Sequence, residues 1–278
     1  DDGDGTWVLD QQRTANKVNE ITDIFETTGP FWVTPVYNRA GNMTTIPKPD
    51  DPTASFTATY DAWNRLVRIE EGEDTVAEYE YDGAKRRTIK KSYASGSLDE
   101  TRHFYYTEPA KWQVVEERVD TSSDPNRQLV WGLRYVDDVL LRDRDTTEDG
   151  SLDERLYGMQ DANWNVTALA DTKGSIQERY TYTAYGTPSV RTPTFASRSN
   201  SSWNWNIRFA GYSWESESWL HYVRNRAYHR EIGAWLQRDT PSRYSLQCLC
   251  QAKGRQGEKH MLAGASRNTR LHPRAIRC

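Results

Sequence analysis

The sequence predicts an all-β protein built from stacked antiparallel β-hairpins, and three observations predict it. Hydrophobic residues make up only 36% of the 278 residues and the mean hydropathy is −0.90, yet the chain holds 11 Trp and 16 Tyr. Rings with a polar edge suit half-buried strand faces better than a helical core. Apolar and polar residues alternate with a period of two along much of the chain. A short phrase that begins with Tyr-Asp or Tyr-Asn also recurs about every 20 residues.

The alternation predicts individual hairpins. In Thr75–Tyr81 the apolar and aromatic side chains occupy alternate positions, residues 82–85 (Asp-Gly-Ala-Lys) have turn chemistry, and Arg87–Tyr93 returns. A second hairpin is expected further along, with strands at Val166–Ala170 and Ile176–Tyr182 joined by a turn at 171–174. Helical periodicity is nearly absent, and the one short helix expected lies around Arg13–Phe25.

The repeated phrase predicts how each hairpin is built. Its copies begin at Tyr37, at Tyr60-Asp61 and at Tyr81-Asp82, and degenerate copies follow. We expect the Tyr ring to pack on the ring one repeat away, and the Asp to bond backbone amides and start the turn. Gly or Asn near the apex accepts positive φ, and the following Arg or Lys lies near the turn carboxylate. Turn chemistry explains these Asp residues fully, so we interpret them as structural rather than catalytic.

The chain also divides by composition. Residues 240–278 hold eight Lys or Arg against one Glu, a net charge of +7, which leaves −11 for residues 1–239. Residues 47–52, 121–125 and 187–202 are interpreted as loops within a repeat array. No apolar run reaches membrane-spanning length. The chain shows no signal-peptide pattern and begins without Met, as expected for a fragment.

Two possible metal sites are considered and set aside, so no metal and no cofactor is expected. Aligning Gly150 with the invariant glycine of a calcium loop puts Asp145 first, but Leu156 then stands where a Glu is required. The basic tail holds Cys248, Cys250, Cys278, His260 and His272, whose spacing matches no usual zinc module.

A dense aromatic and arginine segment spans 208–239, where arginines are expected to stack on rings. This segment resembles the core-ending signature of the Rhs/YD-repeat proteins, and with the Tyr-Asp phrases the resemblance covers about residues 35–239. The matching positions are Arg208, Phe209, Gly211, Leu220, Tyr222, Arg224, Arg226, Tyr228, Gly233, Trp235, Arg238 and Asp239.

The resemblance implies a spiral β-sheet that forms part of a hollow shell around a variable C-terminal segment, often a toxin. Arg238 and Asp239 match the self-cleaving site of some members, but a second Asp is absent after Asp239. Such chemistry needs two carboxylates sharing a proton. We therefore expect no self-cleavage and no catalytic residue.

The function expected from these observations is a non-enzymatic encapsulating scaffold, with its own or an adjacent C-terminal segment as cargo. The alternative is a cell-surface or cell-wall module that binds carbohydrate through exposed Trp and Tyr. No nucleic-acid partner and no transmembrane segment are expected, and the resemblance implies an extracellular or cell-surface location.

Four regions are expected. Residues 1–34 form the edge of a truncated repeat region, 35–207 the YD-repeat shell, 208–239 the core signature and 240–278 a disordered basic tail. The tail has two open explanations, a genuine variable end or translation in a shifted reading frame.

Overall fold

The computed structural model describes residues 7–108 and 111–238. The chain divides into two units, Asp1–Arg238 and Asp239–Cys278, and the description below concerns the first. The basic tail and the tail cysteines and histidines therefore lie outside the described residues. No helix in the described part of the chain is long and apolar enough to cross a membrane.

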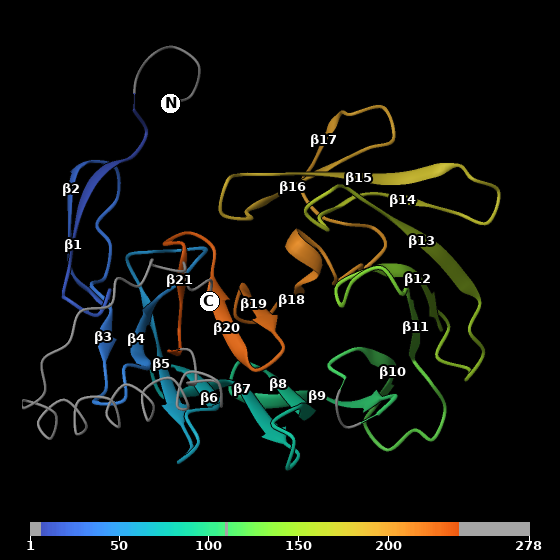
Figure 1. Ribbon diagram of the computed structural model, residues 1–278, viewed down its shortest axis with the longest axis horizontal. Helices are drawn as coiled ribbons and strands as arrows, with labels where there is room; N and C mark the ends of the chain where they lie inside the picture. Colours follow the sequence, from blue (N-terminus) through green and yellow to red (C-terminus); the bar gives the residue numbers. More distant parts are fainter. Residues whose placement is uncertain (1–6, 109–110, 239–278) are drawn as a thin grey trace, which may run out of the picture. The chain divides into compact units, whose positions relative to one another are not determined.

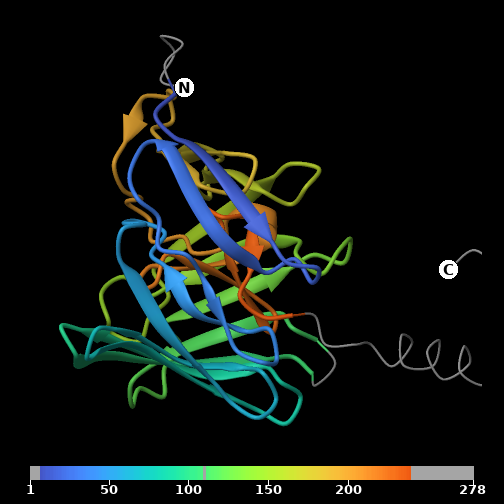
Figure 2. The ribbon, with the colours of Figure 1, turned by 90° about the vertical axis from the view of Figure 1, so that its left-hand side faces the viewer.

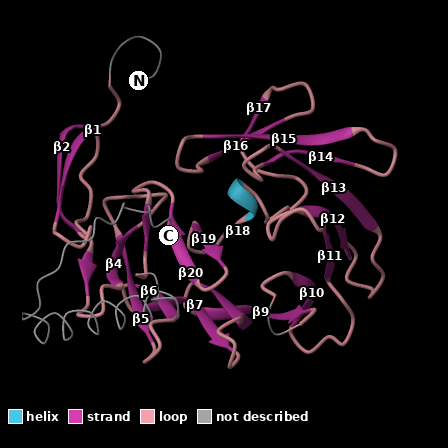
Figure 3. Cartoon of the chain, in the orientation of Figure 1, coloured by secondary structure: helices cyan, strands magenta, loops and turns pink. Residues whose placement is uncertain are grey.

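Within the described ranges the strands form three antiparallel sheets (Figures 1 and 3). The first is a hairpin of β1 (Asp10–Ala15) and β2 (Ile21–Thr28). The second contains fifteen strands: β3 (Val36–Tyr37), β4 (Met43–Pro47), β5 (Ser55–Tyr60), β6 (Leu66–Glu71), β7 (Asp74–Tyr81), β8 (Arg87–Ala94), β9 (Ser97–Tyr106), β10 (Val114–Val119), β11 (Arg127–Trp131), β12 (Val139–Arg144), β13 (Glu154–Gln160), β14 (Val166–Ala170), β15 (Ile176–Tyr182), β16 (Pro188–Arg191) and β17 (Ser197–Arg198). The third contains β18 (Ser213–Glu215), β19 (Leu220–Val223), β20 (Arg226–His229) and β21 (Ala234–Trp235).

The fifteen-stranded sheet confirms the predicted architecture of serial antiparallel hairpins. Each of its strands pairs with the strands just before and after it in the chain, so the order in space is the order in sequence. The sheet curves, and its early strands and its late strands lie on opposite sides of β18–β21 (Figure 1). The predicted hairpins correspond to β7–β8 and β14–β15.

The four-stranded sheet, here called the inner sheet, supplies apolar contacts to the early strands. Leu220 and Leu236 share one buried cluster with Ile46 and Ile69 of β4 and β6. A second cluster joins the late strands to the segment before the inner sheet, and it includes Leu156, Leu169 and Trp205. The two clusters hold opposite parts of the curved sheet to residues 203–236.

The predicted helix around Arg13–Phe25 is wrong, because this segment forms the β1–β2 hairpin, a separate ribbon in Figure 2. Asn16 explains the error. Its Oδ1 accepts hydrogen bonds from the amides of Val18 and Glu20, and Asn19 takes a left-handed φ of 61°. This local turn overrides the helical spacing of the apolar residues.

The loop prediction for residues 187–202 is wrong in part, because β16 and β17 lie within it. Residues 121–125 do form a connection between strands, as expected. The two strands were missed because they have four and two residues, too short for alternation to be visible.

Candidate functional site

The Tyr-Asp phrase forms an Asx turn in which the aspartate organises the backbone. Asp82 Oδ1 accepts hydrogen bonds from the amides of Ala84 and Arg86, both at 2.9 Å, and Oδ2 accepts one from Arg86 Nε at 2.7 Å. Asp61 makes the equivalent bonds to Trp63 and Arg65. Burial alone would raise the pKa of Asp82, but the hydrogen bonds from Arg86 lower it overall.

The tyrosine of the phrase makes a hydrogen bond across the edge of its hairpin, which we call the tyrosine latch. Tyr60 donates its hydroxyl to Met43 O at 2.6 Å, and Tyr81 donates to Leu66 O at 2.7 Å. Each acceptor is the first residue of the preceding strand. Other tyrosines do the same, namely Tyr106 to Arg87 O and Tyr182 to Val166 O. The hydroxyl of Tyr37 instead accepts a bond from the amide of Ile21.

An arginine, rather than a second ring, lies over two of the latch tyrosines, Tyr81 and Tyr106. Arg65 Cζ is 4.9 Å from the ring centroid of Tyr81, and Arg86 Cζ is 4.7 Å from that of Tyr106. Arg65 Nη1 also donates to the carbonyl of Asp82, one turn further on. The expected ring-on-ring contact between neighbouring repeats is therefore replaced by a cation–π contact.

The residues of the predicted core signature lie in and around the inner sheet. In chain order they are Arg208, Phe209 and Gly211 at the 3₁₀ turn, Leu220 and Tyr222 on β19, Arg224 in a turn, Arg226 and Tyr228 on β20, Gly233 in a turn and Trp235 on β21. Their role as a family signature stays a prediction.

Two signature positions show why their residue types are needed. Gly211 has a φ of +72°, and a Cβ there would lie 2.5 Å from Cβ of Asp137. Asp137 also pairs with Arg224 at 3.0 Å. These contacts hold the inner sheet against the connection between β11 and β12.

Arg238 and Asp239, the matches to the self-cleaving site, fall at the limit of the described residues. Arg238 pairs with Glu20 and lies against Gly41, whose hypothetical Cβ would be 1.9 Å from Arg238 Nε. Asp239 lies outside the described residues. The matched arginine is thus a structural contact to the β3–β4 turn.

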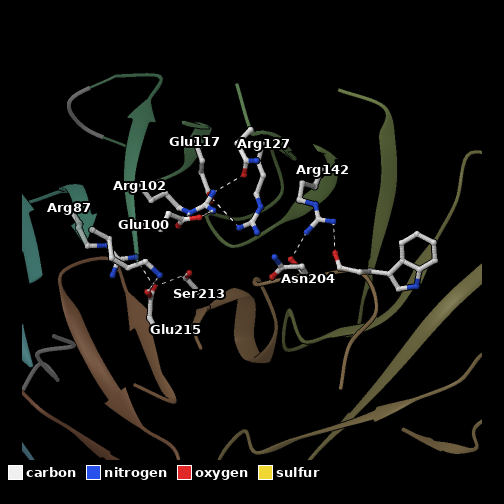
Figure 4. A network of polar contacts seen from close by, with 12 residues as sticks. Arg87, Glu100, Arg102, Glu117, Arg127, Arg142, Asn204, Ser213 and Glu215 are labelled. Atoms are coloured by element: carbon white, nitrogen blue, oxygen red, sulfur yellow. Dashed lines mark hydrogen bonds and ion pairs between the residues drawn. The ribbon is translucent and has the colours of Figure 1, made fainter. Parts of the chain in front are cut away.

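The feature that sequence reasoning missed is a cluster of buried ion pairs on the inner face of β8–β12, the inner-face charge cluster (Figure 4). Arg87 Nη2 lies 2.6 Å from Glu215 Oε1, and Lys90 Nζ lies 2.9 Å from Glu215 Oε2. On the next strands Glu117 pairs with Arg102 at 2.9 Å and with Arg127 at 3.2 Å. Further along, Arg142 pairs with Glu154 and donates to the carbonyls of Trp203 and Asn204.

Charged residues on a strand are usually assigned to the solvent face, which is why this cluster was missed. One signal was present, because Arg102 alternates with Phe104 and Tyr106 and so shares their face of β9. Arg87 is likewise surrounded by rings, with its Cζ 3.9 Å from the ring centroid of Tyr222 and 4.8 Å from that of Phe104.

Burial and pairing act in opposite directions on the pKa values of this cluster. Burial would raise the pKa of Glu215, but Arg87 and Lys90 hold it well below its ordinary range. Burial dominates at Glu217, whose pKa is raised although Lys90 lies 3.1 Å away. Burial also lowers the pKa of Arg127 to about 10, although the carboxylate of Glu117 acts in the opposite direction.

A cavity of about 570 Å³ opens beside the cluster, between the curved sheet and the inner sheet. Arg87, Lys90, Arg102 and Arg127 reach it from the large sheet. Residues 199–208 and β18 form other parts of its lining, including Trp205, Arg208, Trp214 and Glu215. The lining is polar and rich in both signs of charge.

The described residues do not assemble a metal centre. No group of three or more His, Cys, Asp or Glu side chains within 7–108 and 111–238 could hold a metal ion. Asp145, considered for calcium, instead accepts hydrogen bonds from the amides of Thr147, Glu148 and Gly150. This carboxylate organises a turn.

Comparison with known proteins identifies relatives in two ways, although no protein-family model matches the chain. In sequence it is 28% identical over 205 residues to the tRNA3(Ser)-specific nuclease WapA of Bacillus spizizenii and to the tRNA(Glu)-specific nuclease WapA of Bacillus subtilis subsp. natto. A tRNA nuclease WapA of Bacillus subtilis is 27% identical over the same length. These matches cover 73% of this chain, which spans about 8% of the length of these curated relatives.

In structure the chain is similar to solved Tc toxin assemblies. One is the Photorhabdus luminescens Tc holotoxin pore with a mutation in TccC3, at a TM-score of 0.51, 17% identity and coverage of 83% of this chain and 12% of the other. Another is TcdB2-TccC3-Cdc42, at a TM-score of 0.51, 16% identity and coverage of 84% and 12%. The fold is therefore the shell-like β fold of these assemblies. Together with the sequence relatives, it confirms the predicted resemblance to the Rhs/YD-repeat proteins.

The comparisons also correct the expected function. The prediction of a non-enzymatic scaffold is wrong, and so is the prediction that the protein is not an enzyme, because the curated relatives are named as tRNA nucleases. The prediction relied on the lack of a catalytic motif, but a chain spanning 8% of its relatives leaves most of their length outside the comparison. The carbohydrate-binding alternative is not favoured, and nothing supports the expected exclusion of nucleic acid.

Proposed function

We propose that this chain is part of a nuclease toxin that acts on tRNA. The observation that carries the proposal is the match over 205 residues to relatives named for tRNA cleavage. In this proposal the described residues contribute a wall of the toxin's β-shell. The cleaving activity belongs to a segment beyond the core signature, which the shell holds as cargo.

Two features of the described residues support a wall with a functional inner side. The large sheet curves around the inner sheet (Figure 1), and its concave face carries buried ion pairs beside a cavity of about 570 Å³. The cavity is lined largely by polar and charged side chains, so this face is suited to contact with a polar occupant.

The division into regions at 34/35, 207/208 and 239/240 stays a prediction, as does the role of the repeat and signature residues. We also retain an extracellular or cell-surface location as a proposal based on the family resemblance. These predictions and the proposed location are independent of the nuclease proposal, so evidence against any of them would not count against the nuclease activity.

The proposal is tested with the complete protein expressed from its gene, alongside the 278-residue chain and a shortened chain that ends at Arg238. Each is incubated with total tRNA, and the 3′ ends of the products are sequenced. We expect the complete protein to cut one class of tRNA at one position. Intact tRNA after prolonged incubation with the complete protein contradicts the proposal. Cleavage by the shortened chain that ends at Arg238 would contradict the location of the activity beyond the described residues.

A further inference from the structure

At the end of the cavity that Trp214 lines, two arginines lie close to its ring. Arg208 Cζ lies 5.6 Å from the ring centroid of Trp214, and Arg230 Cζ lies 4.4 Å from it. Arg208 is also 5.5 Å from the ring centroid of Tyr180, and its Nε donates to Trp205 O at 2.9 Å. The Nε bond and the two rings fix the plane of the guanidinium before any ligand arrives.

The positive charge at this end is incompletely paired. Among the residues that the structure describes, no carboxylate lies within ion-pair distance of Arg208, and the only hydrogen bond of its side chain is the one from Nε. Arg230 is only 4% exposed and uses Nε for Glu231, while its Nη1 is buried without a partner. Burial lowers the pKa of Arg230, and the Glu231 carboxylate offsets this only in part.

The acids nearby are already occupied. Glu215 is bonded by Arg87 and Lys90. Glu178 accepts hydrogen bonds from Arg198, Ser201 and Ser202. Glu217 pairs with Lys90, and Glu100 pairs with Arg102. The lining also holds Asp99 and neutral hydrogen-bonding residues, namely Ser199, Asn200, Asn204, Asn206 and Ser213.

We propose that this end of the cavity is a binding site for an oxyanion, the carboxylate or phosphate group of a small molecule. The free Nη atoms of Arg208 form the fork that binds two oxygens of such a group, and Arg230 supplies the second charge. The cavity volume of about 570 Å³ is typical of small-molecule sites rather than of a surface for folded RNA. The inference does not depend on the nuclease proposal.

The test is isothermal titration of the full 278-residue chain with sodium phosphate and, separately, with sodium acetate, at an ionic strength held constant with sodium chloride. We expect saturable binding of at least one anion, weakened about tenfold or more by Arg208→Gln. Arg208→Lys keeps the charge and loses the fork, so we expect intermediate affinity. The anion that binds more tightly identifies the group the site prefers.

Arg179→Gln is the matched control. Arg179 Nε also donates to a carbonyl, Pro193 O at 2.9 Å, and its guanidinium lies 4.5 Å from the ring centroid of Phe195. It is not part of the cavity lining, so this variant is expected to bind as the parent does. The proposal is overturned by no saturable binding, by unchanged binding in Arg208→Gln, or by equal loss in Arg179→Gln.

Folding of each variant is checked by its thermal melt. If Arg208→Gln does not fold, Arg208→Lys decides the question, and parental affinity in that variant overturns the proposal. Because the titration contains no RNA, failure of the nuclease assay leaves its result unaffected.

Discussion

At the scale of single residues, the Asx turns could be predicted because they are local. Asp82 reaches backbone amides only two and four residues away, so the sequence contains everything the turn needs. The residue three positions after the Asp takes a left-handed φ even where it is Lys85 or Trp164. Only Gly or Asn was expected at this position. A left-handed backbone conformation is costly for residues such as Lys85 and Trp164, and the hydrogen bonds of the aspartate carboxylate offset that cost.

A buried histidine, His229, predicts that the stability of the fold depends on pH. The sequence alone did not indicate that this ring is buried. His229 Nδ1 accepts a hydrogen bond from the amide of Ile232, so Nε2 carries the hydrogen that is donated to Pro47 O at 2.7 Å. Burial lowers the pKa of His229 to about 4. The native state therefore keeps this ring neutral, whereas the unfolded ring takes up a proton near pH 6.5.

We expect the free energy of unfolding to fall as the pH decreases from 6.5 towards 4, by about 2 kcal/mol at pH 5 from His229. Urea unfolding at pH 7.5, 6 and 5 measures this loss. His229→Gln should remove that part of the pH dependence, whereas His103→Gln, at a partly exposed position on β9, should retain it. Identical pH dependence in the parent and in His229→Gln would show that His229 does not contribute.

At the scale of elements, alternation located the hairpins closely. Strands expected at 75–81 and 87–93 are found at Asp74–Tyr81 and Arg87–Ala94, because period-two burial and the Asx turn agree. The tyrosine latch could not be predicted in the same way. Its acceptor is a backbone carbonyl 15 to 19 residues earlier, for example in Tyr81 and Tyr106, and it depends on the register of the strands.

The latch can be tested with two adjacent tyrosines. Tyr106 donates to Arg87 O at 2.9 Å, whereas Tyr105 is 43% exposed and points to the other face of β9. Tyr106→Phe should lower the free energy of unfolding by about 1 kcal/mol, because Arg87 O loses its partner. Tyr105→Phe should change it little. Urea unfolding of both variants decides, and equal losses would mean that the latch adds no stability.

At the scale of the whole first unit, the long-range contacts were beyond the sequence. The sequence identified the aromatic and arginine segment at 208–239, but not that β18 returns to β8. Glu215 and Arg87 are separated by 128 residues in the chain and form a buried pair. Neither local alternation nor turn chemistry carries information about such a pairing, which depends on the curvature accumulated over many strands.

The ion pair predicts a large loss of stability when one partner is removed. Arg87→Met leaves Glu215 buried with Lys90 alone, and we expect a loss of about 3–5 kcal/mol. Arg118→Met is the control, since Arg118 is partly exposed and pairs with Glu116 at 2.6 Å. That pair should contribute no more than about 1 kcal/mol.

Chemical denaturation followed by tryptophan fluorescence compares the two arginine variants. Similar losses in both would contradict a special role for the inner-face charge cluster. The double variant Arg87→Met with Glu215→Leu removes both charges, and we expect it to recover part of the loss because no unpaired charge remains buried.

The pairing of Arg87 with Glu215 also has a consequence for synthesis on the ribosome. Serial hairpins can form as they emerge, but Arg87 must wait for a partner 128 residues later. At typical translation rates that interval is about 6 to 26 s. During it Arg87 and Lys90 lack the carboxylate of Glu215, whereas Arg102 and Arg127 can already pair with Glu117 on their own sheet. The order of synthesis thus leaves the β8 end of the inner-face charge cluster as the last part to be neutralised.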